Sequence, residues 1–249
     1  MSAIYILWLR QVKRYLRSKP RIIASLGQPL LFLVALGFGF GPIFQRAGQG
    51  NYIQFLAPGV IGMTILFTGI FSGIELIWDR QFGFLKETLV APVPRILVMI
   101  GRTLGGATVA MIQGLIVVAI CFAAGFRVTN YSGLPAAFLF MVLVAIMFTA
   151  LGTAIASVLS DFQGFQFVMN FLVMPIFFLS GALFPLTNVP AVLKMIASID
   201  PLAYGVDGLR AALGSAQIQF GATLDLVVLS VIAAVFLWMG GYLFSKIQL

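Results

Sequence analysis

The residues that could do chemistry are few and scattered in this chain. Its 249 residues include no histidine and a single cysteine, Cys121. Histidine-based zinc sites, haem ligation and Ser-His-Asp triads are therefore excluded, and one cysteine forms neither an intrachain disulfide nor a thiolate metal cluster. Each of the seven acids falls in a loop or at the end of an apolar segment: Glu75, Asp79, Glu87, Asp161, Asp200, Asp207 and Asp225. We expect no catalytic residue and no metal ligand.

Phosphate-binding sequence is also missing. The chain has no G-x-x-x-x-G-K-[ST] and not even one Gly-Lys pair. Gly37, Gly39 and Gly41 form a G-x-G-x-G, but it lies inside an apolar segment with no strand before it. We therefore expect no nucleotide or other cofactor on this chain.

The elements that carry these residues are expected to be membrane helices. The chain is 61% hydrophobic and 9% charged, whereas soluble domains are about 25% charged. Six stretches of 20 residues or more lack any charge, and about 20 apolar residues suffice for a helix to cross a bilayer. The apolar runs do not alternate as in a β-barrel. We predict an all-α integral membrane protein, one domain over residues 1–249, with a six-span bundle in 22–245. The expected spans are 22–44, 54–77, 96–125, 135–158, 164–184 and 223–245.

The basic residues predict the orientation of this bundle. With the N-terminus inside, eleven lie on the cytoplasmic side: Arg10, Lys13, Arg14, Arg17, Lys19, Arg21, Arg80, Lys86, Arg95, Arg102 and Lys246. Four lie outside: Arg46, Arg127, Lys194 and Arg210. Because basic residues in short loops are retained in the cytoplasm, both termini are expected there. The net charge of +8 then serves orientation and lipid headgroups, and nucleic acid is not an expected partner.

An amphipathic helix is predicted over residues 1–20, ahead of the first span. Its basic residues recur every three or four positions and so share one face: Arg10, Lys13, Arg14, Arg17 and Arg21. Such a helix should lie along the cytoplasmic interface, with this face turned to anionic lipid or to a partner, until Pro20 breaks it. A plain orientation signal is the simpler alternative.

Two connections between spans carry structure of their own. On the cytoplasmic side, Asp79–Pro94 has helix formers at 84–89, and its exposed aromatics within a charged rim are typical of a protein contact: Phe82 and Phe84 beside Arg80, Lys86 and Glu87. A loop helix lying on lipid is the alternative. On the outer side, prolines divide residues 185–222 into apolar pieces too short to span, which are expected to form short helices dipping back into the membrane.

Polar residues inside the spans are expected to join helices. They are Gln28, Thr64, Thr68, Gln113 and Asn170, and interhelical hydrogen bonds are a more common role for such residues than substrate binding. Gly69/Gly73 and Gly101/Gly105 have the spacing that lets helices approach closely. Because no ionisable group is expected near the midplane, ion-coupled transport is disfavoured.

Two stretches resemble a known family. The first is F-L-A-P-G (55–59) followed by D-R-Q-F-G-F-L-K-E-T-L-V-A-P-V-P-R (79–95). The second is F-F-L-S-G-A-L-F-P (177–185) followed by I-D-P-L-A-Y-G-V-D-G-L-R (199–210). With six spans and an amphipathic start, the chain resembles the membrane permease subunit of type-2 ATP-binding-cassette (ABC) exporters over nearly its whole length.

The resemblance implies a partner and a set of functional residues. A separate nucleotide-binding subunit would hold ATP and magnesium, and two permease copies, expected as a homodimer, would complete the exporter in the inner membrane. The coupling helix between spans two and three would carry Arg80, Phe82, Phe84, Leu85, Lys86 and Glu87. The interfacial helix would dock through Arg10, Lys13, Arg14 and Arg17. The outer re-entrant region would be marked by Gly181, Pro185, Pro201, Tyr204 and Arg210.

The implied function is outward movement of an amphipathic or hydrophobic substrate, such as a drug, a lipid or a lipid-linked glycan. Two alternatives remain open. One is a non-transporting membrane scaffold or immunity protein of the same fold. The other is an integral membrane enzyme acting on lipid through Asp200, Asp207 and Arg210, although an outer-surface salt-bridge cluster is the simpler role for these three.

Overall fold

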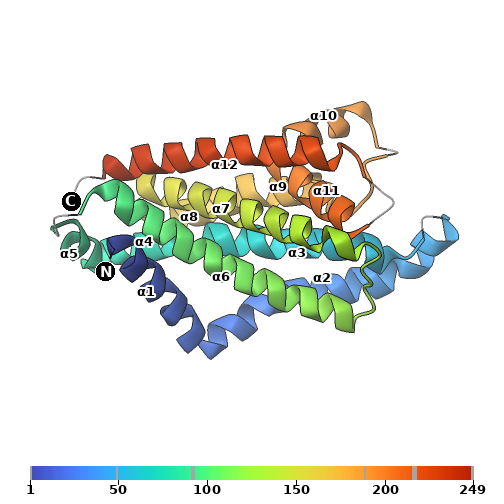
Figure 1. Cartoon of the computed structure of the whole chain (residues 1–249), viewed down its shortest axis with the longest axis horizontal. Coiled ribbons are helices and arrows are strands. Elements are labelled where there is room, and N and C mark those ends of the chain that lie inside the picture. The colour runs from blue at the N-terminus through green and yellow to red at the C-terminus, as the bar shows by residue number, and fades with distance from the viewer. Residues whose placement is uncertain (1, 49, 91–92, 188, 215–217, 248–249) are drawn as a thin grey trace.

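The computed structural model describes residues 2–48, 50–90, 93–187, 189–214 and 218–247. Within these residues every regular element is a helix (Figure 1). Six helical stretches are long and apolar enough to cross a membrane: 19–46, 52–81, 95–123, 131–158, 162–179 and 222–245. The prediction of an all-α membrane protein with six spans is confirmed, and most boundaries lie within a few residues of those expected.

Three of the spans are single α-helices, and three contain a break or a change of helix type. The unbroken ones are α2 (Lys19–Arg46), α6 (Arg95–Ala123) and α12 (Ala222–Ser245). The second span is interrupted at 72–73, between α3 (Tyr52–Phe71) and α4 (Ile74–Gln81). A short 3₁₀ turn (Tyr131–Gly133) leads into α7 (Leu134–Val158). The fifth span runs through α8 (Phe162–Val168), a π-helical turn (Met169–Val173) and α9 (Met174–Leu179).

The fifth span ends earlier than predicted. We expected it to reach residue 184, but α9 stops at Leu179. Gly181 then adopts a left-handed conformation with φ of +75°, which glycine tolerates at no steric cost and which turns the chain out of the helix. The apolar residues after it therefore form a turn and not a further helical turn.

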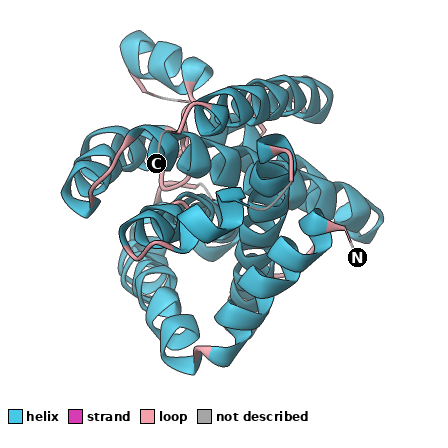
Figure 2. Cartoon of the chain, turned by 90° about the vertical axis from the view of Figure 1, so that its left-hand side faces the viewer, coloured by secondary structure: helices cyan, strands magenta, loops and turns pink. Residues whose placement is uncertain are grey.

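The two ends of the bundle differ in what they carry (Figure 1). The start of α1 (Ala3–Arg17), α5 (Phe84–Val90) and the last turn of α12 lie at one end, which we call the α5 end. The short helices α10 (Ala191–Ile199) and α11 (Pro201–Leu213) lie at the other, the α11 end. Seen along the bundle, α1 and α2 diverge from their junction at Ser18 as the two arms of a V (Figure 2). Helices were expected at 84–89 and within 185–222, and both are present.

Glycine permits the closest helix contacts in the core. A Cβ on Gly73 would lie 2.3 Å from the carbonyl oxygen of Gly152 in α7. At Gly101 and Gly105 of α6, a Cβ would meet α1 at Ile4 and Leu7 and at Gln11 respectively. Both pairs of glycines that the sequence marks thus face a neighbouring helix, and the second pair seats α1 on α6.

Candidate functional site

A cluster of charged residues joins four helices near the α5 end. Asp79 of α4 accepts a hydrogen bond from Arg10 of α1 (3.2 Å) and another from Arg102 of α6. Glu75, one turn earlier in α4, pairs with Arg21 of α2 and lies 3.9 Å from Arg14 of α1. We call these four arginines and two acids the charge cluster. Buried carboxylates are costly unless paired, and here each has at least two guanidinium groups within 4.0 Å.

The charge cluster was not anticipated from the basic face of residues 1–20. Arg10 and Arg14 were expected to face lipid or a partner, but they reach carboxylates of the same chain. Lys13 and Arg17 remain exposed. Tyr15 of the same helix is buried, and its hydroxyl donates to Gln113 of α6. The helix is therefore held to the bundle by polar contacts as well as by packing.

The segment expected to dock a partner divides into an exposed and a buried part. The side chains of Phe82 and Phe84 are 77% and 53% exposed, whereas Leu85 is fully buried. Gly83, with φ of +81°, makes the turn between α4 and α5. The guanidinium of Arg10 lies 5.3 Å from the centre of the Phe84 ring, within cation–π range.

These positions give the predicted coupling residues different roles. Phe82 and Phe84 present apolar surface, while Leu85 anchors α5 to the core. Arg80 is half-buried at the end of α4. The side chains of Lys86 and Glu87 lie outside the described part of the chain.

At the α11 end, Arg210 and Tyr204, two of the residues singled out from the sequence, form hydrogen bonds with backbone carbonyl groups. Buried Arg210 donates to the carbonyl oxygens of Gly181 (2.9 Å), Ala182 (3.3 Å) and Phe55 (3.4 Å), with its guanidinium 3.9 Å from the centre of the Phe55 ring. The hydroxyl of Tyr204 donates to the carbonyl of Ser198. Burial lowers the pKa of Arg210 to about 10. This arginine ties α11 to α3 and to the turn after α9.

Asp200 and Asp207 of the same region accept hydrogen bonds from backbone N–H groups. Asp207 accepts hydrogen bonds from the N–H groups of residues 219 to 221 at 2.7 to 3.3 Å. Asp200 caps α11 by accepting from the N–H of Leu202 at 2.8 Å, and burial raises its pKa to about 7. Within the described chain no ion pair joins Asp200 or Asp207 to Arg210. The expected outer-surface salt-bridge cluster is therefore wrong, because these groups are buried and bond to peptide groups instead.

The remaining marked residues shape turns. Pro201 occupies the first turn of α11, where its missing N–H costs nothing. Pro185 lies in the irregular segment that follows Gly181. We find no role for either beyond the backbone path.

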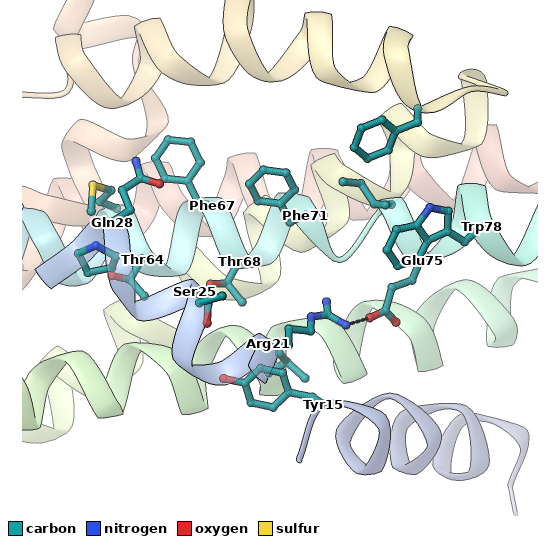
Figure 3. Close-up of a pocket in the computed structure, with 16 residues that line it drawn as sticks. Tyr15, Arg21, Ser25, Gln28, Thr64, Phe67, Thr68, Phe71, Glu75 and Trp78 are labelled. Atoms are coloured by element: carbon teal, nitrogen blue, oxygen red, sulfur yellow. Dashed lines mark hydrogen bonds and ion pairs between the residues drawn. The ribbon is translucent and has the colours of Figure 1, made fainter. Parts of the chain in front are cut away.

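A cavity of about 530 Å³ lies between α2, α3 and α4. Figure 3 shows Arg21 and Glu75 at one end of it and Gln28 and Thr64 at the other. Its apolar lining includes Met63, Phe67, Phe71 and Trp78, and its uncharged polar lining includes Ser25, Gln28, Thr64 and Thr68. Tyr15, Val109 and Phe162 contribute from α1, α6 and α8. The charge cluster thus borders the cavity through Arg21 and Glu75.

The polar residues inside the spans fall into separate roles. Gln113 bonds across helices to Tyr15, as expected of such residues. Gln28, Thr64 and Thr68 instead line the cavity, and Asn170 is exposed on the fifth span. Sequence reasoning missed the cavity, although the spacing of Thr64 and Thr68 by four residues placed them on one face of their helix.

Comparison with known proteins identifies the family of this chain. The family model described as "ABC-2 type transporter" matches residues 2–213. The chain belongs to the ABC-2 type transporter family. The prediction from the two sequence stretches is thereby confirmed.

Several members of the family are similar to this chain along most of its length. A protein named as a transport permease, ycf38, from Pyropia yezoensis is 31% identical over 88% of this chain and 77% of its own. Nodulation protein J of Rhizobium leguminosarum bv. trifolii is 28% identical over 82% and 79%. The inner membrane transport permease YadH of Escherichia coli (strain K12) is 25% identical over 93% and 91%. The family and these names make the chain a multi-pass transporter component.

Proposed function

We propose that this chain is the membrane permease of an ATP-driven exporter, and that it moves an amphipathic or hydrophobic substrate outward across an inner membrane. The observation that carries the proposal is the cavity of about 530 Å³, which is mainly apolar and extends from the charge cluster into the membrane-spanning part of the bundle. A pathway without fixed charge beyond its end favours apolar or lipid-attached molecules, because an uncompensated charge at mid-bilayer costs about 3 kcal/mol or more.

The proposal needs an energy source from a second polypeptide, since the sequence has no P-loop. We place a nucleotide-binding subunit, with its ATP and magnesium, against the α5 end. Exposed Phe82 and Phe84 supply the apolar anchors that protein contacts require, and Arg10 beside Phe84 supplies part of a charged rim. This docking places the α5 end in the cytoplasm, which agrees with the excess of basic residues there.

Movement at α5 has a physical route to the cavity. Leu85 fixes α5 to the core, and Gly83 joins it to α4. Glu75 and Asp79 of α4 are bonded to α1, α2 and α6. A displacement of α5 by the ATPase would therefore shift α4 together with its arginine partners, and two permease copies moving as rigid bodies would open and close a path.

The test is to co-express the chain with a candidate ATPase subunit and to reconstitute the complex in proteoliposomes. We expect Phe82→Ala with Phe84→Ala to abolish co-purification and to remove the effect of the permease on ATP hydrolysis. Trp238→Ala is the matched control, because this aromatic residue on α12 is 72% exposed and lies outside the docking segment. Uphill transport or ATP hydrolysis by the chain alone would contradict the proposal, as would unchanged coupling in the double variant.

A further inference from the structure

Among the described residues that line the cavity, the charged ones lie at one end. Arg21 and Glu75 form an ion pair at the end nearer to α5, and the dashed line in Figure 3 marks their contact. Seven residues further along α2, Gln28 lies at the opposite end beside Thr64. At 1.5 Å per helical residue, about 10 Å separates the two ends. Between them the side chains are aromatic, aliphatic or uncharged.

Among the described side chains, the charged end carries more positive than negative groups. The charge cluster sets four guanidinium groups against two carboxylates. Asp79 is bonded to Arg10 and Arg102, and Arg14 lies 4.0 Å from Asp79. Arg14 also lies 3.9 Å from Glu75, so it is shared between the two carboxylates, whereas Arg21 pairs with Glu75. The excess creates a positive potential that favours an anion at this end of the cavity.

We propose that the cavity binds an amphiphile with an anionic headgroup, and that the headgroup replaces Glu75 on Arg21 while the apolar tail lies along Phe67 and Phe71. The assignment rests on the proposed function and adds the chemical class of the substrate to it. Phosphate is the headgroup that fits best, because guanidinium binds its oxygens in a fork.

The exchange of partners is feasible on energetic grounds. The Arg21 side chain is 36% exposed, so its guanidinium is accessible to a new partner, and the buried Glu75 keeps Arg14 at 3.9 Å when Arg21 is withdrawn. A phosphate group accepts two parallel charge-assisted hydrogen bonds from one guanidinium, and such bonds are stronger than those between neutral groups. An anionic headgroup should therefore bind roughly tenfold or more tightly than a neutral or cationic one with the same tail.

Trp78 allows binding to be measured in the cavity itself. The sequence has three tryptophans, and Trp78 is the one that lines the cavity. Full-length protein carrying Trp8→Phe and Trp238→Phe in phosphatidylcholine nanodiscs reports only from this position. Three probes share one brominated alkyl chain, which quenches nearby tryptophan: an alkyl phosphate, an alkylphosphocholine and an alkyltrimethylammonium. We expect the phosphate to reach half-quenching at a concentration at least ten times lower than the other two.

Variants of Arg21, Glu75 and Arg17 distinguish a direct contact between the headgroup and Arg21 from attraction by the positive charge of the surrounding surface. Arg21→Gln should abolish the preference for phosphate, and Arg21→Lys should retain part of it. Glu75→Gln should tighten phosphate binding, since it removes the competing carboxylate. Arg17→Gln is the control, because this exposed arginine does not line the cavity. If Trp8→Phe reduces the yield of protein, the quenching of Trp78 can be obtained instead as the difference between the parent protein and Trp78→Phe.

The outcomes distinguish this assignment from the proposed function. Equal quenching by the three probes, or an unchanged preference in Arg21→Gln, overturns the anionic assignment and leaves the transport proposal intact. Absence of quenching by every probe overturns the cavity as a substrate site and removes the support for both. Displacement of the alkyl phosphate by equimolar inorganic phosphate overturns the role of the tail.

One further titration identifies the source of the headgroup. In discs that contain phosphatidylglycerol, loss of the alkyl phosphate signal identifies a bilayer phospholipid as the occupant. An unchanged signal identifies a dedicated ligand. Either result supports an anionic headgroup on Arg21.

Discussion

Removal of the Asp79 carboxylate should destabilise the whole bundle. Arg102 is 6% exposed and its ion-pair partner is Asp79. Asp79→Asn leaves this guanidinium buried without a counter-charge, and breaking a buried pair in this way costs about 3 to 5 kcal/mol. Arg10 loses its carboxylate partner at the same time. For a chain of this size, each kcal/mol lowers Tm by about 2 to 4 °C, so we expect a decrease of about 10 °C.

The single cysteine provides the assay. Cys121 is fully buried in α6, so a thiol-reactive fluorogenic dye reports unfolding of the protein in detergent. Asp161→Asn is the matched control, because Asp161 is exposed and asparagine preserves its cap on α8. Replacing both partners, with Asp79→Leu and Arg102→Met, should recover at least half of the lost Tm, since the buried guanidinium is removed together with its partner and Arg10, which also loses Asp79, is 37% exposed. A melting temperature of Asp79→Asn within about 2 °C of the parent would refute the reasoning.

Three further predictions concern the α11 end and the helix contacts. Gly59→Ala should lower Tm by several degrees, because the added Cβ would lie 2.3 Å from the carbonyl oxygen of Ala182. Gly39→Ala is the control and should leave Tm unchanged, since no atom lies within 4 Å of the added Cβ. Melting curves recorded with the thiol-reactive dye compare the two variants. Burial raises the pKa of Asp200 to about 7, above its ordinary value of about 4. The folded protein therefore binds an extra proton across this window, so its stability should fall as pH rises from 4 to 7. Melting curves of Asp200→Asn should lack that slope. Asp207→Ala should speed hydrogen exchange at the amides of residues 219 to 221 by at least tenfold, since these amides lose their shared acceptor. Unchanged exchange rates would show that the Asp207 carboxylate does not hold this segment.

The spans were predictable because they depend on one local property. Charge-free length decides whether a helix can cross a bilayer, and it is read directly along the chain. The departures occur where backbone geometry decides instead. Gly181 turns the chain before the apolar run is exhausted, and the break at Ser72–Gly73 divides a span that hydropathy presents as continuous. Neither signal depends on hydrophobicity.

The site was less predictable because its contacts join distant parts of the chain. Arg10 lies 69 positions before Asp79, and Arg21 lies 54 positions before Glu75. The sequence indicates a basic face on residues 1–20 but contains nothing that assigns its partners. Helical periodicity places Thr64 and Thr68 together, yet only the packing of α2 against α3 makes them a cavity wall.

The charge cluster links the two proposals by thermodynamic reciprocity. Arg10 contacts both Asp79 and Phe84, so docking at α5 and the pairing of α4 with its arginines are not independent. A headgroup that draws Arg21 away from Glu75 leaves that carboxylate to Arg14 and so alters the hold of α1 on α4. If substrate changes the affinity of the permease for the ATPase by some factor, the ATPase must change the affinity for substrate by the same factor. Phosphate-headed amphiphile and ATPase subunit should therefore alter each other's Kd equally. Glu75→Gln should reduce that factor, because Glu75 connects Arg21 to Arg14, which also lies 4.0 Å from Asp79.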